Sequence, residues 1–141
     1  MKYITLIFAI LLIARSPAIS QTQIVRSVYF TNNSFSIPEK YKPMLKQLAL
    51  QCASDSCTRI KIYGYADTTG SEEYDDYLSK KREEAVYDFM LSSGKFDTAL
   101  VYRDVLGKGG DLYDLHFPQA HLYHRCVDIK VEFYKVKHKL E

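Results

Sequence analysis

The segment 71–94 constrains the fold most, because its helical pattern of apolar residues includes a basic residue. At 100° per residue Arg82 falls within the apolar stripe, four residues after Leu78; the stripe comprises Tyr74, Leu78, Ala85 and Phe89, with Val86 at its edge. A guanidinium facing a core is costly unless it meets an anion or a pocket. The nearest acid before the helix is Asp67, which follows an alternating strand predicted at 60–64. We therefore expect Asp67 and Arg82 to meet in space.

The first twenty residues have the pattern of an export signal. Lys2 precedes an apolar run at 4–13, and Ala18 and Ser20 are the small residues that a signal peptidase requires. Cleavage after Ser20 would leave Gln21 at the start of the mature chain. The run is too short to span a bilayer comfortably. A retained anchor is the alternative, which Arg15 leaves open because a basic residue follows the run directly.

The charge balance argues against two classes of partner. The chain has 19 basic and 17 acidic residues, and removing residues 1–20 takes away Lys2 and Arg15 and no acid, which leaves 17 of each. A neutral chain lacks the basic field that nucleic acid or an anionic membrane needs. The remaining 121 residues (141 − 20) are a length typical of one domain with one core.

Three cysteines in an exported chain suggest one disulfide and one remaining thiol. Cys52 and Cys57 enclose a four-residue loop at 53–56, so we expect them to pair. Two reduced thiols are the alternative, because spacing alone does not establish disulfide geometry. Cys126 lies in the last predicted strand, where we expect a packing or surface role.

The order of predicted elements is β-α-β-α-β-β, which indicates an α+β fold. Strands are predicted at 28–30, 60–64, 100–105 and 126–133, and helices at 38–52 and 71–94. The last strand is the clearest, because apolar residues alternate with polar ones from 126 to 133. A strand with one polar side implies a mixed sheet with both helices on one face. We expect an extension at 21–27, a domain at 28–134 and a charged tail at 135–141.

The region around Arg82 also resembles the signature of a known family. Gly64-Tyr65-Ala66-Asp67-Thr68-Thr69-Gly70-Ser71, followed by Leu78-Ser79 and Arg82, is similar to the OmpA-like C-terminal domain, whose pattern is roughly G-[YH]-[TA]-D-x-x-G-x-x-x-x-N-x-x-L-S-x-x-R-A. The segment 124–129 resembles the closing N-R-R-V-E-I strand of that family. The resemblance covers about residues 28–134 and implies the family's two-layer sandwich.

The resemblance implies a non-catalytic module without a cofactor that binds the peptide stem of peptidoglycan in the periplasm, at the cell wall or outer membrane. Asp67 would take the ammonium of diaminopimelate and Arg82 its carboxylate. The implied ligand-binding residues are Asp67, Arg82, Tyr65, Thr68, Gly70, Asp75, Leu78 and Arg125. Outer-membrane or envelope-complex proteins are further implied partners. No membrane span is expected after signal cleavage.

The chain departs from the family pattern at several positions. Asp75 replaces the usual asparagine, Glu83 an alanine, His124 the first residue of N-R-R and Cys126 its second arginine. The departures indicate a divergent member. They leave open a structural module that has lost the ligand and contacts another envelope protein. In that case Asp67 and Arg82 would form a structural ion pair, which is common in proteins.

For several residues we expect structural roles in place of functional ones. Tyr74 is expected in the core, and Arg125 is as compatible with packing at the sheet edge as with ligand binding. The acids Glu72, Glu73, Asp75 and Asp76 are expected to form a solvated helix start. His116, His121, His124 and Cys126 have zinc- or copper-binding side chains, but scattered loop histidines rarely form a site, so we expect no metal. Motifs of serine hydrolases, zinc proteases and phosphate loops are missing, so no enzyme is expected.

Overall fold

The computed structural model describes residues 19–54, 56–66, 71–108 and 125–136. The elements along the chain are β1 (Ile19–Tyr29), the 3-10 helix η1 (Glu39–Tyr41), α2 (Lys42–Cys52), β2 (Cys57–Ala66), α3 (Glu72–Gly94), the 3-10 helix η2 (Thr98–Leu100), β3 (Val101–Lys108) and β4 (Cys126–Val136). Apart from the two short 3-10 helices, this is the predicted β-α-β-α-β-β order.

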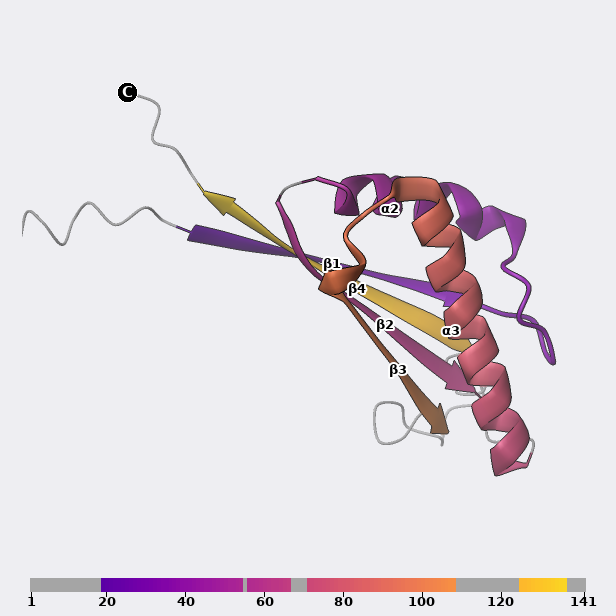
Figure 1. Cartoon of the computed structure of the whole chain (residues 1–141). Coiled ribbons are helices and arrows are strands. Elements are labelled where there is room, and N and C mark those ends of the chain that lie inside the picture. Colours follow the sequence, from indigo (N-terminus) through magenta and orange to yellow (C-terminus); the bar gives the residue numbers. More distant parts are fainter. Residues whose placement is uncertain (1–18, 55, 67–70, 109–124, 137–141) are drawn as a thin grey trace, which may run out of the picture.

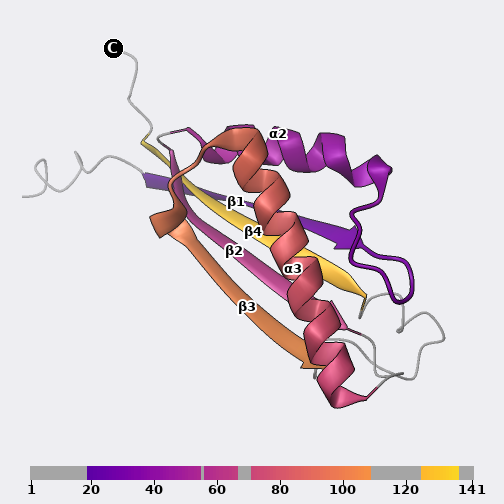
Figure 2. The ribbon, with the colours of Figure 1, turned by 45° about the vertical axis from the view of Figure 1, so that its right-hand side comes forward.

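The strands form one mixed sheet in the order β1-β4-β2-β3. β4 is antiparallel to both of its neighbours, and β3 is parallel to β2 at the edge. The two helices lie on the same face of the sheet, with α3 crossing β2 and β3 (Figures 1 and 2). The predicted α+β sandwich with both helices on one face is therefore confirmed.

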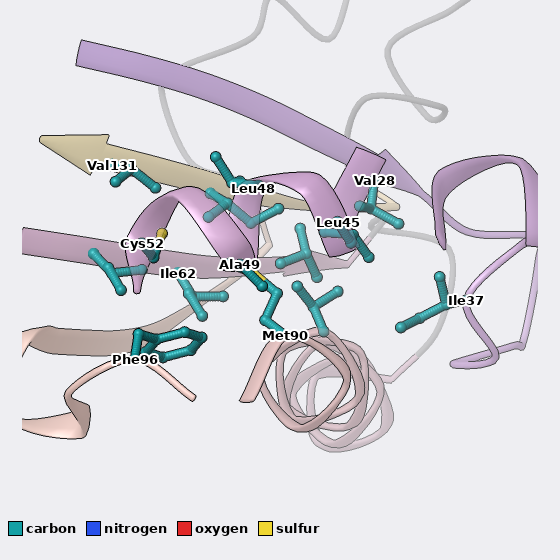
Figure 3. Packing of buried hydrophobic residues seen from close by; sticks show 14 of the residues in the cluster. Val28, Ile37, Leu45, Leu48, Ala49, Cys52, Ile62, Met90, Phe96 and Val131 are labelled. Carbon is teal, nitrogen blue, oxygen red and sulfur yellow. The ribbon is translucent and has the colours of Figure 1, made fainter. Parts of the chain in front are cut away.

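The core lies between this face of the sheet and the two helices (Figure 3). Val127, Ile129 and Val131 of β4 are fully buried, as the alternation of that strand predicts. They pack with side chains from every layer, among them Val28, Leu45, Leu48, Ala49, Ile60, Ile62, Val86 and Met90. Burying this apolar surface is the main term that holds the helices on the sheet.

β1 is longer than the sequence indicates. It begins at Ile19, and its pairing with β4 runs from Ile19 opposite Val136 to Tyr29 opposite Cys126. Residues 21–27, expected as an extension ahead of the domain, are therefore part of the sheet. β1 is an edge strand with β4 on one side, so it carries exposed polar residues such as Gln21 and Gln23 that hide the strand pattern.

The ends of α3 follow standard capping chemistry. Ser71 is the N-cap, as predicted, and its hydroxyl accepts a hydrogen bond from the Tyr74 amide at 3.3 Å. Glu72 and Glu73 in the first turn stabilise the positive end of the helix dipole. The helix ends at Gly94, after which Lys95 adopts a left-handed conformation with φ 48°.

The buried side of α3 differs from the predicted stripe. It consists of Asp75, Leu78, Ser79, Arg82, Glu83, Val86, Met90 and Gly94. Tyr74 is 42% exposed, so the prediction that it packs in the core is wrong. Val86, expected at the edge of the stripe, is fully buried. This side of α3 faces the sheet and includes Glu83, which binds Arg103 of β3.

Cys52 and Cys57 do not form the expected disulfide, because all three cysteines are free thiols in this structure. Cys52 ends α2, Cys57 begins β2, and their buried side chains hydrogen-bond to each other. Burial raises the pKa of Cys52 and Cys57 above the ordinary value, and it raises the pKa of Cys126 to about 12. The structure thus agrees with the alternative expectation, in which Cys52 and Cys57 are two reduced thiols.

Because the thiols are buried and protonated, we expect the native protein to resist alkylation by iodoacetamide at pH 8. In denaturant without reductant, all three cysteines should react, as counted by mass spectrometry. One modified cysteine and two protected ones would contradict the reduced state. Since an unfolded thiol ionises near 9.0, the stability that these raised pKa values contribute is present below that pH and is lost as the pH rises further.

Candidate functional site

Arg82 is fully buried at 0% exposure, although it carries a charge. Its Nε donates a hydrogen bond to the carbonyl of Ser34 at 2.8 Å, and its Nη2 donates one to the carbonyl of Thr31 at 3.2 Å. These carbonyls belong to the turn that follows β1. Hydrogen bonds to a charged group compensate part of the cost of removing it from water. Arg82 is therefore directed toward the end of β1, and it does not point into bulk solvent.

Residues next to the end of β1 and the start of β4 lie close to the guanidinium of Arg82. The guanidinium carbon of Arg82 lies 5.4 Å from the centre of the Phe30 ring, within the range of a cation–π contact. The Phe30 amide donates to the carbonyl of Arg125 at 2.8 Å. Cys126 is next along β4, and the charge of Arg82 opposes the rise that burial and Asp128 impose on the Cys126 pKa. Phe30 thus contacts Arg82 through its ring and Arg125 through its backbone amide.

The first turns of α3 add further buried groups. Asp75 is 2% exposed and Leu78 is 5% exposed, and both lie on the side of the helix that carries Arg82. The prediction that Asp75 belongs to a solvated helix start is therefore wrong, whereas Glu72, Glu73 and Asp76 are exposed as expected. Asp75 also accepts through its backbone carbonyl a hydrogen bond of 2.5 Å from the Ser79 hydroxyl.

β2 contributes Tyr65, which is 4% exposed. Gly64 precedes it, and a Cβ at Gly64 would lie 3.0 Å from Cβ of Glu83 and 2.5 Å from the carbonyl oxygen of Ser79. Only glycine allows β2 to approach α3 this closely. This close approach fixes the end of β2 relative to α3, the helix that carries Arg82.

Three of the predicted ligand-binding residues lie outside the described part of the chain. These are Asp67, Thr68 and Gly70, which follow the end of β2 at Ala66. The pairing of Asp67 with Arg82 therefore stays a prediction. Among the described residues, the structure brings Arg82, Asp75 and Leu78 together on one side of α3 and places Arg125 beside Phe30.

The polar residues predict the turn at 31–34, but its contact with Arg82 was not expected from the sequence. The turn is closed by a hydrogen bond of 3.3 Å from the Ser34 amide to the Thr31 carbonyl, and Asn33 within it has φ 50°. The polar run Thr31-Asn32-Asn33-Ser34 indicates a turn, but no residue in it indicates a contact with Arg82. The partners are backbone carbonyls, which every residue carries, so the sequence holds no direct signal for them.

A second ion pair joins α3 to the edge strand. Glu83 is buried, and its carboxylate accepts two hydrogen bonds from Arg103 of β3, at 2.6 Å from Nε and 2.8 Å from Nη2. This pairing raises the pKa of Arg103, whose guanidinium also lies 4.1 Å from the ring centre of Tyr87. Glu83 stands where the family pattern has alanine. This departure therefore attaches α3 to β3.

Beside this pair is an open hollow of about 440 Å³ between α3 and β3, lined by Lys80, Glu83, Glu84, Arg103, Asp104 and Val105. None of the described residues predicted to bind the ligand is among those that line it. In the described part of the chain no three metal-ligating side chains are grouped. His116, His121 and His124 lie outside that part.

Comparison with known proteins bears on this arrangement. The sequence profile of the OmpA family matches residues 29–112, which is more than half of the chain and includes β2, α3 and the turn at 31–34. The chain belongs to the OmpA family.

Individual relatives agree with this assignment. The peptidoglycan-associated lipoprotein of Buchnera aphidicola is 32% identical over 68 residues, which are 48% of this chain and 39% of that protein. The chain thus matches well under half of that relative's length. The crystal structure of the peptidoglycan-associated lipoprotein from Burkholderia pseudomallei is 30% identical, with a TM-score of 0.65, over 78% of this chain and 90% of the other.

A more distant structure has the same fold. The cell wall anchor of the T6SS from Pseudomonas aeruginosa has a TM-score of 0.62 and 18% identity, over 91% of this chain and 94% of the other. At that identity the similarity concerns the fold alone. Among the described residues of this OmpA-family chain, no helix is both long and apolar enough to cross a membrane.

Proposed function

We propose that this OmpA-family chain binds peptidoglycan without covalent attachment, in the periplasm of a bacterial cell envelope, and that it is not an enzyme. The buried, oriented guanidinium of Arg82 carries this proposal, because it stands at the position that the family signature reserves for arginine. The membership in a family with peptidoglycan-associated lipoproteins supports it. The chain would serve as a wall-binding protein or dock an envelope complex to the wall.

The proposed ligand is the diaminopimelate residue of the peptide stem. Its far end carries both an ammonium and a carboxylate. A protein carboxylate and a guanidinium placed side by side therefore select it over a simple amine or a simple carboxylic acid. Asp67 would accept the ammonium and Arg82 would donate to the carboxylate. A charged hydrogen bond is worth about 1.5–3 kcal/mol net. Modest affinity at each site suffices, because a repeating polymer supplies avidity.

The other proposed contacts are placed around this pair. Tyr65 of β2 and Asp75 and Leu78 of α3 would line the site, together with Arg125, which directly precedes β4. Thr68 and Gly70 would contribute from the segment after β2. Nε of Arg82 binds the carbonyl of Ser34. A ligand carboxylate therefore meets Arg82 through its other N–H groups or displaces the turn at 31–34. That turn is mostly exposed, so displacing it uncovers little apolar surface.

One observation favours a second candidate, a structural module that has lost the ligand and contacts another envelope protein. Arg82 has no solvent-exposed surface and is held by two backbone carbonyls of its own chain. A sealed guanidinium of this kind stabilises the end of the sandwich without a ligand. In that case the protein would fail to bind the wall and would co-purify with a stable partner.

Co-sedimentation with purified sacculi distinguishes the two candidates. We expect the wild-type protein to sediment with sacculi and the Asp67→Ala/Arg82→Ala double variant to stay in the supernatant. Two charge-assisted interactions are lost together, so retention should fall more than about tenfold.

A charge-matched control removes one acid and one base from exposed positions of the same helix. The variant Glu72→Ala/Lys80→Ala does this, since both residues are exposed on α3. It should sediment as the wild type does. Equal sedimentation of the wild type and the Asp67/Arg82 variant would reject the site, and no sedimentation of the wild type would reject the function.

A further inference from the structure

The turn at 31–34 presents two carbonyls to Arg82 from an exposed loop. The carbonyl of Thr31 accepts hydrogen bonds from both the Ser34 amide and Nη2 of Arg82, and the Ser34 carbonyl accepts from Nε. Thr31, Asn32 and Asn33 are themselves exposed. The orientation of a fully buried cation is thus set in part by residues on the surface.

Asn33 determines the path of this turn. Its φ of 50° lies in the left-handed region, which asparagine and glycine adopt readily and β-branched residues avoid. A residue that avoids this region would change the turn and rotate the carbonyls on either side of it. Local hydrogen bonds reinforce the turn, from the Asn33 amide to the Asn32 side chain at 3.1 Å and from the Ser36 amide to the Ser34 hydroxyl at 3.1 Å.

We propose that Asn33 is a positioning residue for ligand recognition, which acts by holding the carbonyls of Thr31 and Ser34 on Arg82. This inference rests on the proposed function of the site. The carbonyls fix one edge of the guanidinium and Phe30 supports its face, so Arg82 has little freedom left to lose when a carboxylate binds. Preorganisation of this kind increases affinity without a direct contact between Asn33 and the ligand.

The direct test compares three single variants in binding to a soluble peptide stem that contains diaminopimelate. Asn33→Gly preserves the left-handed conformation and should bind within about twofold of the wild type. Asn33→Val disfavours it and should weaken binding about tenfold. Ser36→Ala is the matched control, because Ser36 is also exposed, has no positive φ and hydrogen-bonds to the turn through its backbone amide, so this variant should bind as the wild type does.

A second measurement does not depend on the ligand. The Nε–H of Arg82, identified in a ¹⁵N NMR spectrum by its absence from Arg82→Lys, should exchange slowly with water in the wild type and in Asn33→Gly. It should exchange at least about tenfold faster in Asn33→Val. Circular dichroism verifies that each variant is folded. A structural effect on the turn alone would change this exchange but would leave ligand affinity unchanged.

The outcomes separate this inference from the proposed function. If the wild type binds, Arg82→Lys loses binding and Asn33→Val binds as tightly as the wild type, the role of Asn33 is refuted and the site stands. If the wild type does not bind the stem, the proposed function is refuted, and the role of Asn33 in recognition with it. Unchanged Nε–H exchange in Asn33→Val would refute the positioning mechanism itself.

Discussion

Replacing Arg82 by alanine is expected to destabilise the protein by about 3 kcal/mol and to abolish wall binding. The side chain is fully buried, so its loss leaves a cavity beside Phe30 and removes two charge-assisted hydrogen bonds to the turn at 31–34. The relief of a buried charge offsets part of this cost. Urea denaturation followed by circular dichroism measures the change in the free energy of unfolding.

A second substitution at Arg82 separates stability from binding. Arg82→Met keeps most of the side-chain volume and removes the charge, so its unfolding free energy should lie within about 1.5 kcal/mol of the wild type. It should nevertheless lose binding to sacculi as fully as alanine does. A stable Arg82→Met protein that still binds would show that the guanidinium does not recognise the ligand. Equal stability of Arg82→Ala and the wild type would contradict the buried contacts.

Gly94→Ala is expected to destabilise the fold by about 3 kcal/mol, although alanine is the better helix former. Gly94 ends α3 where it crosses α2, and a Cβ there would lie 2.5 Å from the carbonyl carbon and 2.8 Å from Cβ of Ala49. The atoms that the added Cβ would meet include the backbone of Ala49 in α2, so the two helices must move apart. A melting temperature lower by roughly 10 °C is the expected result.

Two variants test this explanation. Ala49→Gly removes only the Cβ from the obstacle, so the double variant Ala49→Gly/Gly94→Ala should not regain wild-type stability. Ser92→Ala, at an exposed position two residues earlier on α3, should change the unfolding free energy by less than about 0.5 kcal/mol. Full rescue by Ala49→Gly would show that the contact involves side chains alone.

The sequence predicted those parts of the fold in which local chemistry and tertiary structure agree. The alternation of β4 identified its buried side, since Val127, Ile129 and Val131 are all fully buried. Ser71 marked the start of α3 because a serine before two glutamates satisfies the free amides of a helix. The mixed sheet with both helices on one face followed from the polar side of β4 and the order of elements.

The remaining features depend on tertiary contacts that no local pattern encodes. Glu83 of α3 binds Arg103 of β3, Tyr74 lies at the surface and Val86 lies in the core. Asp75 is buried because it lies on the same side of the helix as Arg82. The turn at 31–34 contacts Arg82 through backbone carbonyls. Because every residue has a backbone carbonyl, the sequence does not indicate which of them contact Arg82.

The most direct test of the proposed function compares two soluble peptide stems in calorimetric titrations of the purified protein. One stem carries diaminopimelate, and the other carries lysine at the same position, which keeps the distal ammonium but lacks the carboxylate. If Arg82 binds that carboxylate, the diaminopimelate stem should bind at least about tenfold more tightly. Equal affinity for the two stems, or no binding of either, would contradict the proposal.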